Sequence, residues 1–328
     1  MTMHVIETTA SAGLRLAERP LPEPPAGAVR LRVRAAGVNR PDLLQRRGLY
    51  PPPEGASDVL GLEVAGEVDA LGEGVTGWTL GDPVMALLPG GGYATHALCD
   101  ARHLLRKPDS LSFEAAAGFP ETAYTVWANV FEAGRLRAGE RLFVHGATSG
   151  IGTTACAMAR ALGGTTGTEV WGTAGTREGC EAALSHGYAR CWPREAAWDA
   201  EAHAAGGADV VLDMAGGDYV ARNLSFLRAG GRHVSIAFLR GVACEVNVMD
   251  VMRRRLTLTG STLRARPGEE KARLTDEIRR HVLPHLGRGA LSPVIDRVFP
   301  LAEAEAAHDH LEAGGHVGKV ILRVDRAA

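Results

Sequence analysis

The sequence is poor in several residue types, and each scarcity narrows what the chain can be. Of its 36 basic residues only Lys107, Lys271 and Lys319 are lysines, and the formal net charge is −2. A basic surface for nucleic acid is therefore not expected. No apolar run reaches the roughly 18 residues of a membrane-spanning helix, and the first residues lack the pattern of a secretory signal. We expect neither nucleic acid nor a membrane as a partner.

Cysteine is also scarce. The five cysteines are an odd number, lie far apart and form no CxxC pair: Cys99, Cys156, Cys180, Cys191 and Cys244. A disulfide framework or a structural zinc site would need a more regular spacing. Free thiols are typical of a reducing compartment, so the sequence indicates a cytoplasmic protein.

The remaining composition is that of a globular protein, with 45% apolar and 23% charged residues in a chain of 328. This length suits two domains. Up to about residue 120 the sequence predicts short strands separated by Gly and Pro, as in 29–35, where apolar and charged residues alternate. The segments 294–298 and 319–324 resemble these strands, so we expect 1–120 and 264–328 to form one β-rich domain.

Residues 121–263 have a different sequence pattern, in which short apolar strands alternate with helices. This pattern is typical of a doubly wound parallel sheet. A long polar helix is expected after it, from Pro267 to about Leu286. The six predicted strands of the sheet are 141–145, 169–173, 189–192, 208–213, 231–236 and 256–260.

The turn after the first of these strands has the composition of a dinucleotide-binding turn. Small residues there allow the backbone to approach a pyrophosphate at the N-terminus of a helix. The three glycine positions of GxGxxG hold Ala147, Ser149 and Gly152, and Gly150 adds conformational freedom. A tight strand–helix connection without a ligand is the alternative. The predicted cofactor-binding residues here are Gly146, Ala147, Thr148, Ser149, Gly150, Ile151 and Gly152.

The end of the next strand distinguishes the two nicotinamide cofactors. An NAD site usually places an acidic side chain there, on the ribose 2′-hydroxyl. Here Gly175, Thr176 and Arg177 follow the strand, and no acid precedes Glu178. Arg177, together with Arg194 after the third strand, is suited to a 2′-phosphate, although both arginines could simply be solvated. The sequence therefore favours NADPH.

Several segments together resemble a known family: residues 35–50, 60–66, 86–92, 145–152 and 315–320. Over nearly its whole length the chain is similar to the zinc-free quinone oxidoreductases (zeta-crystallin-like) of the medium-chain dehydrogenase/reductase superfamily, and most of all to their p53-inducible branch. The resemblance implies an α/β fold, a Rossmann doubly wound parallel sheet inserted in a GroES-like β-rich catalytic domain. It also implies a cleft between the domains and a homodimer or homotetramer, of which we expect the homodimer.

The same resemblance assigns roles to individual residues. Asn39 and Leu62 stand where zinc-dependent relatives have a Cys and a His, and neither can ligate zinc, so no metal is expected. Asn39, Asp42 and Tyr50 form the implied catalytic set near the nicotinamide, with Asp42 better suited to a structural role. Leu44 replaces a second tyrosine of the zeta-crystallin type, which leaves Tyr50 as the aromatic candidate. The implied further cofactor contacts are Thr125, Ala237, Phe238, Ser261, Leu263 and Lys319.

The function implied is metal-free, NADPH-dependent hydride transfer to a quinone or another small electrophilic acceptor, in which Asn39 and Tyr50 hydrogen-bond an acceptor oxygen. Alternatively, Asn39 satisfies loop backbone and Tyr50 only packs. Two other functions stay open: reduction of the double bond of an enone or alkenal, and NADPH binding by a stress or structural protein with little turnover. The Gly/Thr stretch 163–168 is longer than the family leads us to expect and has no assigned function.

Overall fold

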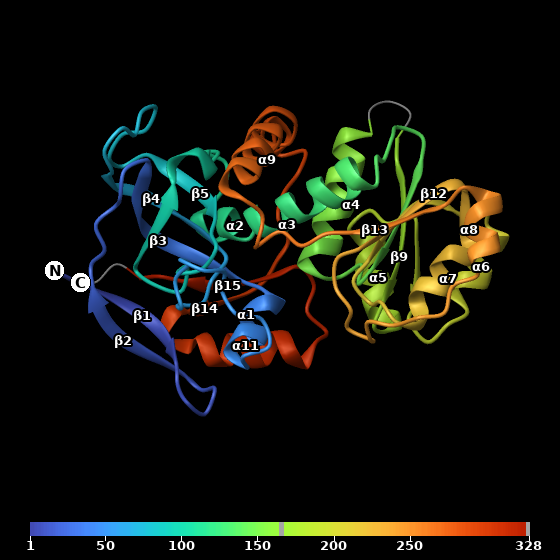
Figure 1. Ribbon diagram of the computed structural model, residues 1–328, viewed down its shortest axis with the longest axis horizontal. Coiled ribbons are helices and arrows are strands. Elements are labelled where there is room, and N and C mark those ends of the chain that lie inside the picture. The colour runs from blue at the N-terminus through green and yellow to red at the C-terminus, as the bar shows by residue number, and fades with distance from the viewer. Residues whose placement is uncertain (164–166, 326–328) are drawn as a thin grey trace. The chain divides into compact units, whose positions relative to one another are not determined.

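The computed structural model describes residues 1–163 and 167–325. It divides the chain into two compact units, Met1–Thr122 with Arg264–Ala328, and Ala123–Leu263 (Figure 1). These limits differ from the expected domain boundaries by at most two residues. Within the Gly/Thr stretch 163–168, residues 164–166 lie outside the described part of the chain. No helix among the described residues is long and apolar enough to cross a membrane.

The first unit is built on a mixed sheet. Its strands follow the order β14-β15-β3-β4-β5-β7, with β6 also paired to β3 and with β1 and β2 forming a separate ribbon. Only β14 and β15 run parallel; the other pairs are antiparallel. The strands are β1 (Thr2–Thr8), β2 (Leu14–Pro20), β3 (Ala28–Val38), β4 (Glu63–Leu71), β5 (Pro83–Leu87), β6 (His96–Asp100), β7 (Leu104–Arg106), β14 (Ile295–Pro300) and β15 (Lys319–Arg323).

The long polar helix expected from Pro267 to about Leu286 is wrong in its extent. The structure has two helices, α9 (Gly268–His281) and α10 (Leu283–Gly287). Pro284 explains the break, because proline has no N–H to bond the carbonyl four residues earlier and its ring crowds that carbonyl. The other helices of this part are α1 (Arg40–Arg46), α2 (Phe113–Ala117), α3 (Pro120–Val126), which crosses the unit boundary, and α11 (Ala304–Ala313).

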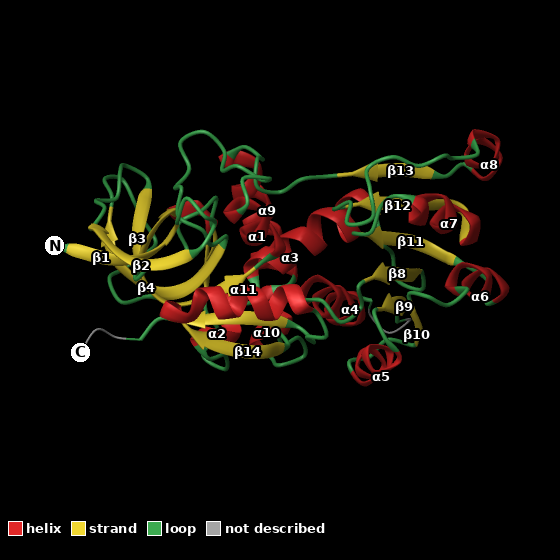
Figure 2. Cartoon of the chain, turned by 90° about the horizontal axis from the view of Figure 1, so that it is seen from below, coloured by secondary structure: helices red, strands yellow, loops and turns green. Residues whose placement is uncertain are grey.

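The second unit contains the predicted parallel sheet. Its six strands follow the order β10-β9-β8-β11-β12-β13, and every pair is parallel. Figure 2 shows them stacked in this order. The aromatic side chains of Phe143, Trp171, Trp198 and Phe226 fill its core. The strands are β8 (Arg141–His145), β9 (Glu169–Ala174), β10 (Arg190–Pro193), β11 (Ala208–Asp213), β12 (Leu227–Ser235) and β13 (Thr257–Gly260).

The connections in this unit are helical, as strand–helix alternation requires. They confirm the predicted α/β fold with a Rossmann-type sheet. A π-helical turn, Trp127–Ala133, precedes the first strand. The helices are α4 (Gly150–Leu162), α5 (Arg177–Ser185), α6 (Trp198–Ala204), α7 (Asp218–Phe226) and α8 (Val248–Arg254).

Candidate functional site

The turn between β8 and α4 is tighter than a side chain would allow. Gly146 has a positive φ of 72°, a conformation that favours glycine. A Cβ on Gly152 would lie 2.3 Å from the carbonyl oxygen of Gly146 and 2.7 Å from that of Ala147. Only glycine therefore fits at 152.

The N-terminus of α4 is open to an anion. Ser149 is the N-cap, and its Oγ accepts a hydrogen bond of 3.0 Å from the Gly152 amide. The amides of Gly150 and Ile151 lie in the first turn, where a helix offers no carbonyl acceptor. Such amides and the helix dipole bind phosphate. The turn thus fits a dinucleotide, and its residues would hold the pyrophosphate.

The end of β9 presents an exposed, cationic surface. A Cβ on Gly175 would meet no atom within 4 Å. Thr176 caps α5, because its Oγ1 accepts from the Gly179 amide at 3.1 Å. Arg177 is exposed at the first position of that helix. Arg194 is also exposed and pairs with Glu195 at 3.3 Å, while its amide bonds Ala174 at the end of β9.

Two of the expected nicotinamide contacts are connected by a residue that the sequence reading missed. The Asn129 Nδ2 donates to the carbonyl of Thr125 at 2.8 Å, and its Oδ1 accepts from the hydroxyl of Ser261 at 2.8 Å. Asn129 is buried in the π-helical turn. A buried polar residue in an apolar helix was the available signal, but its partner lies 132 residues away.

Asp213 also escaped the sequence reading, although it ends a buried apolar strand before two glycines. Burial raises the pKa of its carboxyl to about 6. The carboxyl accepts hydrogen bonds from the amides of Ala215 at 2.7 Å and Gly216 at 3.2 Å. The Arg240 amide in turn bonds the Ala215 carbonyl at 2.7 Å. Asp213 therefore shapes the loop that bonds to residues 236–241, which include the expected contacts Ala237 and Phe238.

In the first unit the structure brings Asn39 and Lys319 together around a buried acid, Glu63. The Asn39 Nδ2 donates to Glu63 Oε1 at 2.9 Å, and Lys319 Nζ donates to Asn39 Oδ1 at 2.5 Å. Lys319 Nζ also lies 2.7 Å from Glu63 Oε1 and 3.0 Å from the Val38 carbonyl. Glu63 was missed, although an acid inside the apolar segment 60–66 was a signal that it is paired.

This arrangement engages the Lys319 ammonium within the first unit, and its expected contact with the cofactor stays a prediction. An ammonium has three N–H donors, and all three point at oxygen atoms of the first unit. Asn39 is also engaged: besides Glu63, its Nδ2 contacts the Gly37 carbonyl at 3.4 Å. This geometry favours the structural alternative for Asn39.

Asp42 has the contacts of a structural residue, the role for which the sequence suits it better, and its place in the catalytic set stays a prediction. Its carboxyl is fully buried and accepts from the amides of Asn39 at 2.8 Å and Gly61 at 3.0 Å, and from the Tyr93 hydroxyl at 3.2 Å. Burial raises its pKa to about 6. The Tyr93 hydroxyl also lies 3.1 Å from His308 Nε2. Asp42 thus joins the start of α1 to the rest of the unit and faces no open space.

Tyr50 differs from these residues. Its side chain is half-buried, and its hydroxyl has no hydrogen-bond partner within the described ranges. Burial raises the pKa of Tyr50, which keeps the hydroxyl protonated. The guanidinium of Arg264 lies 5.5 Å from the centre of its ring. Tyr50 is therefore a protonated donor available to a ligand.

The residues at the two positions discussed for zinc do not suit the ion. Asn39 offers a carboxamide that is already bonded to Lys319 and Glu63, and Leu62 offers only hydrocarbon. In the described parts of the chain no three His, Cys, Asp or Glu residues group as metal ligands.

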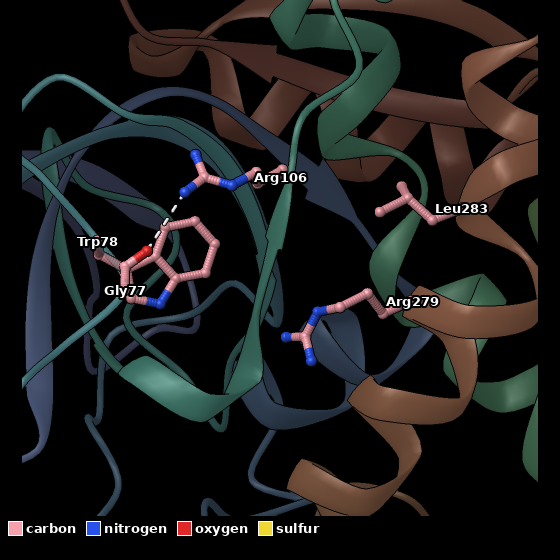
Figure 3. A pocket seen from close by; sticks show the side chains of 5 residues that line it. All are labelled: Gly77, Trp78, Arg106, Arg279 and Leu283. Carbon is pink, nitrogen blue, oxygen red and sulfur yellow. Dashed lines mark hydrogen bonds between the residues drawn. The ribbon is translucent and has the colours of Figure 1, made fainter.

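A cavity of about 290 Å³ lies elsewhere in the first unit (Figure 3). It contains none of the predicted site residues. Arg106 donates to the Gly77 carbonyl at 3.2 Å and lies over the Trp78 ring at 4.8 Å. The lining residues are Gly77, Trp78, Arg106, Arg279 and Leu283.

Comparison with known proteins gives consistent matches. A family model described as alcohol dehydrogenase GroES-like domain matches residues 25–109, and one described as zinc-binding dehydrogenase matches 194–322. The chain is 32% identical to rat quinone oxidoreductase over 308 residues, which cover 92% of this chain and 91% of that protein.

Two solved structures are similar over almost the full chain. The quinone oxidoreductase of Thermus thermophilus, solved also in complex with NADPH, has 34% identity and a TM-score of 0.82, covering 98% of this chain and 99% of its own. The CurK enoyl reductase has 25% identity, a TM-score of 0.85 and the same coverage. The chain therefore belongs to the quinone oxidoreductase family of the medium-chain dehydrogenase/reductase superfamily, and it is an NAD(P)-dependent oxidoreductase.

Proposed function

We propose that this chain catalyses the NADPH-dependent reduction of quinones by hydride transfer, without a metal ion. The observation that carries the choice of cofactor is the end of β9, where exposed Thr176 and Arg177 stand in the place of an acid. The choice of quinone is supported by the identity to quinone oxidoreductases.

The second unit would bind the cofactor largely through its backbone. The turn 146–152 would hold the pyrophosphate, and Arg177 with Arg194 would hold the 2′-phosphate. A charge-assisted hydrogen bond contributes about 1.5–3 kcal/mol, roughly one to two decades of preference for NADPH over NADH. Thr125 and residues 237–238 are proposed to contact the nicotinamide end.

When bound, reduced nicotinamide supplies the hydride. The chain's own contribution is to orient the acceptor and to stabilise the charge that develops on its oxygen. Tyr50 is proposed to donate a hydrogen bond to that oxygen, since its hydroxyl is protonated and unpartnered in the described ranges. Asn39 is proposed to act indirectly, by holding neighbouring groups in position, because Glu63 and Lys319 already occupy its side-chain amide.

Reduction of the C=C bond of enones or alkenals is the second candidate, and the similarity to an enoyl reductase supports it. Steady-state oxidation of NADPH with a benzoquinone and with a small enone separates the two. We expect a higher kcat/KM for the quinone. The reverse order would favour the second candidate, and saturable NADPH binding without any acceptor-dependent oxidation would favour a structural or stress function.

A homodimer is also proposed. Strand β13 is at the edge of the parallel sheet, and large apolar side chains are exposed on it and on the segment before it, including Leu258, Met252, Met249 and Phe238. Exposed edges and apolar patches are typical of interfaces. Light scattering after size exclusion tests this, with a monomer at micromolar concentration as the contrary result. A cytoplasmic location remains a prediction.

A further inference from the structure

Arg264 is a buried cation whose partners are all neutral. Only 6% of the surface of Arg264 is exposed to solvent. Its Nε donates to the Pro89 carbonyl at 2.8 Å, Nη2 to Gln45 Oε1 at 2.7 Å, and Nη1 to the Tyr50 carbonyl at 3.5 Å. Within the described residues no carboxylate lies within 4 Å of the guanidinium. The charge of Arg264 is therefore not neutralised by an ion pair.

A second buried arginine shows what a structural arrangement looks like in this protein. Arg232, at 8% exposure, bonds the carbonyls of Gly134 and Arg135 and forms a two-fold ion pair with Glu140, at 3.0 and 2.5 Å. Buried charges are normally paired in this way, because an unpaired one is costly. Consistent with that cost, burial lowers the pKa of Arg264.

The unneutralised guanidinium lies beside the predicted acceptor residue. Its carbon is 5.5 Å from the ring centre of Tyr50. Arginine has five N–H donors, and the three hydrogen bonds above leave two of them. Gly90 adjoins the same group, since a Cβ there would be 3.5 Å from Nη2. A free hydroxyl and two free guanidinium donors thus lie close together.

We propose that Arg264 is a catalytic residue of the acceptor site, which stabilises the negative charge that develops on an acceptor oxygen beside Tyr50. The inference rests on the proposed function, because Tyr50 identifies the acceptor site. Addition of a hydride, one proton with two electrons, converts a neutral quinone into a hydroquinone monoanion. The second proton comes from water. The substrate class is that of carbonyl acceptors whose reduced form carries charge on oxygen.

The nearby carboxyl group does not neutralise the charge of Arg264 in place of a bound acceptor. The Asp42 carboxyl is bonded to two amides and to Tyr93. Lys271 adds positive charge, since its Nζ donates to the Arg264 carbonyl at 2.7 Å. Removal of one preorganised donor from an oxyanion site costs about 10²–10³ in kcat. We therefore expect kcat to fall about 100-fold in Arg264→Gln.

A series of quinones whose hydroquinones differ in pKa separates a catalytic role from a structural one. If Arg264 were only structural, its substitution would not change how the rate depends on that pKa. For the wild type we expect log(kcat/KM) to depend weakly on that pKa, because Arg264 stabilises every anion. Arg264→Gln should lose most with quinones that form the most basic anions, so the slope steepens. Arg264→Lys should retain part of the activity, and Arg288→Gln, the matched control at an exposed arginine of the same unit, should keep the wild-type slope. An equal loss for all quinones, with an unchanged slope, would overturn the proposal.

Binding of 4-nitrophenol tests Arg264 without turnover. The wild type should bind the phenolate form and lower its apparent pKa, and Arg264→Gln should bind it about 10-fold more weakly, whereas Arg288→Gln should not. Thermal unfolding of each variant verifies that it is folded. If the wild type reduces no quinone, the proposed function fails, yet phenolate binding still decides the role of Arg264. Equal phenolate affinity in wild type and Arg264→Gln would overturn the inference.

Discussion

The two units of this protein build their sites from different materials. In the second unit the predicted cofactor site consists of backbone amides and small residues, and its charged side chains, such as Arg177, are exposed. In the first unit most of the conspicuous polar side chains are buried and bonded to one another, as Asn39, Glu63 and Lys319 are. Two residues differ: the Tyr50 hydroxyl has no hydrogen-bond partner and Arg264 has no counter-charge among the described residues.

This difference teaches how far residue identity predicts a role. A glycine at a tight turn has one main physical reason to be there, which is space, and so Gly152 identifies its site directly. A polar side chain in an interior has two possible reasons, a ligand or a structural partner. For Asn39 and Asp42 the positions of Glu63 and Tyr93 favour a structural partner.

The largest expected effect concerns the stability of the first unit. Lys319→Met leaves the Glu63 carboxylate buried without its cation, which costs about 3–5 kcal/mol of the free energy of unfolding. Urea denaturation measures this loss, and the double variant with Glu63→Gln should recover part of it. If Lys319→Met instead weakens NADPH binding at unchanged stability, the structural role of Lys319 is refuted and the predicted cofactor contact is favoured.

Gly152→Ala tests the backbone site of the second unit. The new Cβ would overlap the Gly146 and Ala147 carbonyl oxygens, so the turn must open. We expect NADPH to bind at least 100-fold more weakly, about 2.7 kcal/mol, in a fluorescence titration. Gly287→Ala is the matched control, because a Cβ there meets no atom within 4 Å. Unchanged NADPH affinity in Gly152→Ala would place the pyrophosphate elsewhere.

Arg177→Ala tests the only part of the cofactor site that depends on a charged side chain. NADPH binding should weaken about 10- to 100-fold, as expected for one charge-assisted contact of roughly 1.5–3 kcal/mol. NADH binding should change little, because NADH lacks the 2′-phosphate. Titrations of both cofactors decide the matter, and equal losses for the two would end the argument for phosphate recognition.

The smallest expected effect is an acid sensitivity that the two units share. Burial lowers the pKa of His145 and His308 to about 3 and that of His233 to about 4, from 6.5. Below pH 6.5 these histidines are protonated in the unfolded chain but stay neutral in the folded protein. The free energy of unfolding therefore falls with falling pH. Asp42 and Asp213, with pKa values raised to about 6, act in the opposite direction between pH 6 and 3.8.

Two of these histidines lie in the second unit, while the first has His308 together with His96 and His316, whose pKa values burial also lowers. Each unit also has one such aspartate. Between pH 7 and 5.5 both units should therefore lose stability, by about 1 kcal/mol for a histidine that stays neutral when folded. Urea unfolding followed by tryptophan fluorescence reports mainly the second unit, and a Trp78 probe reports the first. A loss confined to one of the two transitions would contradict this, as would a His145→Gln variant with unchanged pH dependence.

The fold was largely predictable from the sequence because its signals are local. All six strands of the parallel sheet appear where apolar runs alternate with helical segments, and the C-terminal strands join the first unit as expected. Pro284 was a local signal too, but it was overlooked in favour of the polar periodicity around it. The pairing partners were not predictable, since Lys319 meets Asn39 across 280 positions and Ser261 meets Asn129 across 132.

The place of β15 between β14 and β3 has a consequence for biosynthesis. All residues of the second unit, 123–263, are synthesised before the last two strands of the first sheet, 295–300 and 319–323. The second unit can therefore fold while the first sheet is still incomplete. Until then residues 35–38 of β3 lack their antiparallel partner, and Glu63 has no counter-charge. Completion of the first unit is thus delayed until residues 319–323 have been translated, and a nascent chain that stops before them should depend on chaperones.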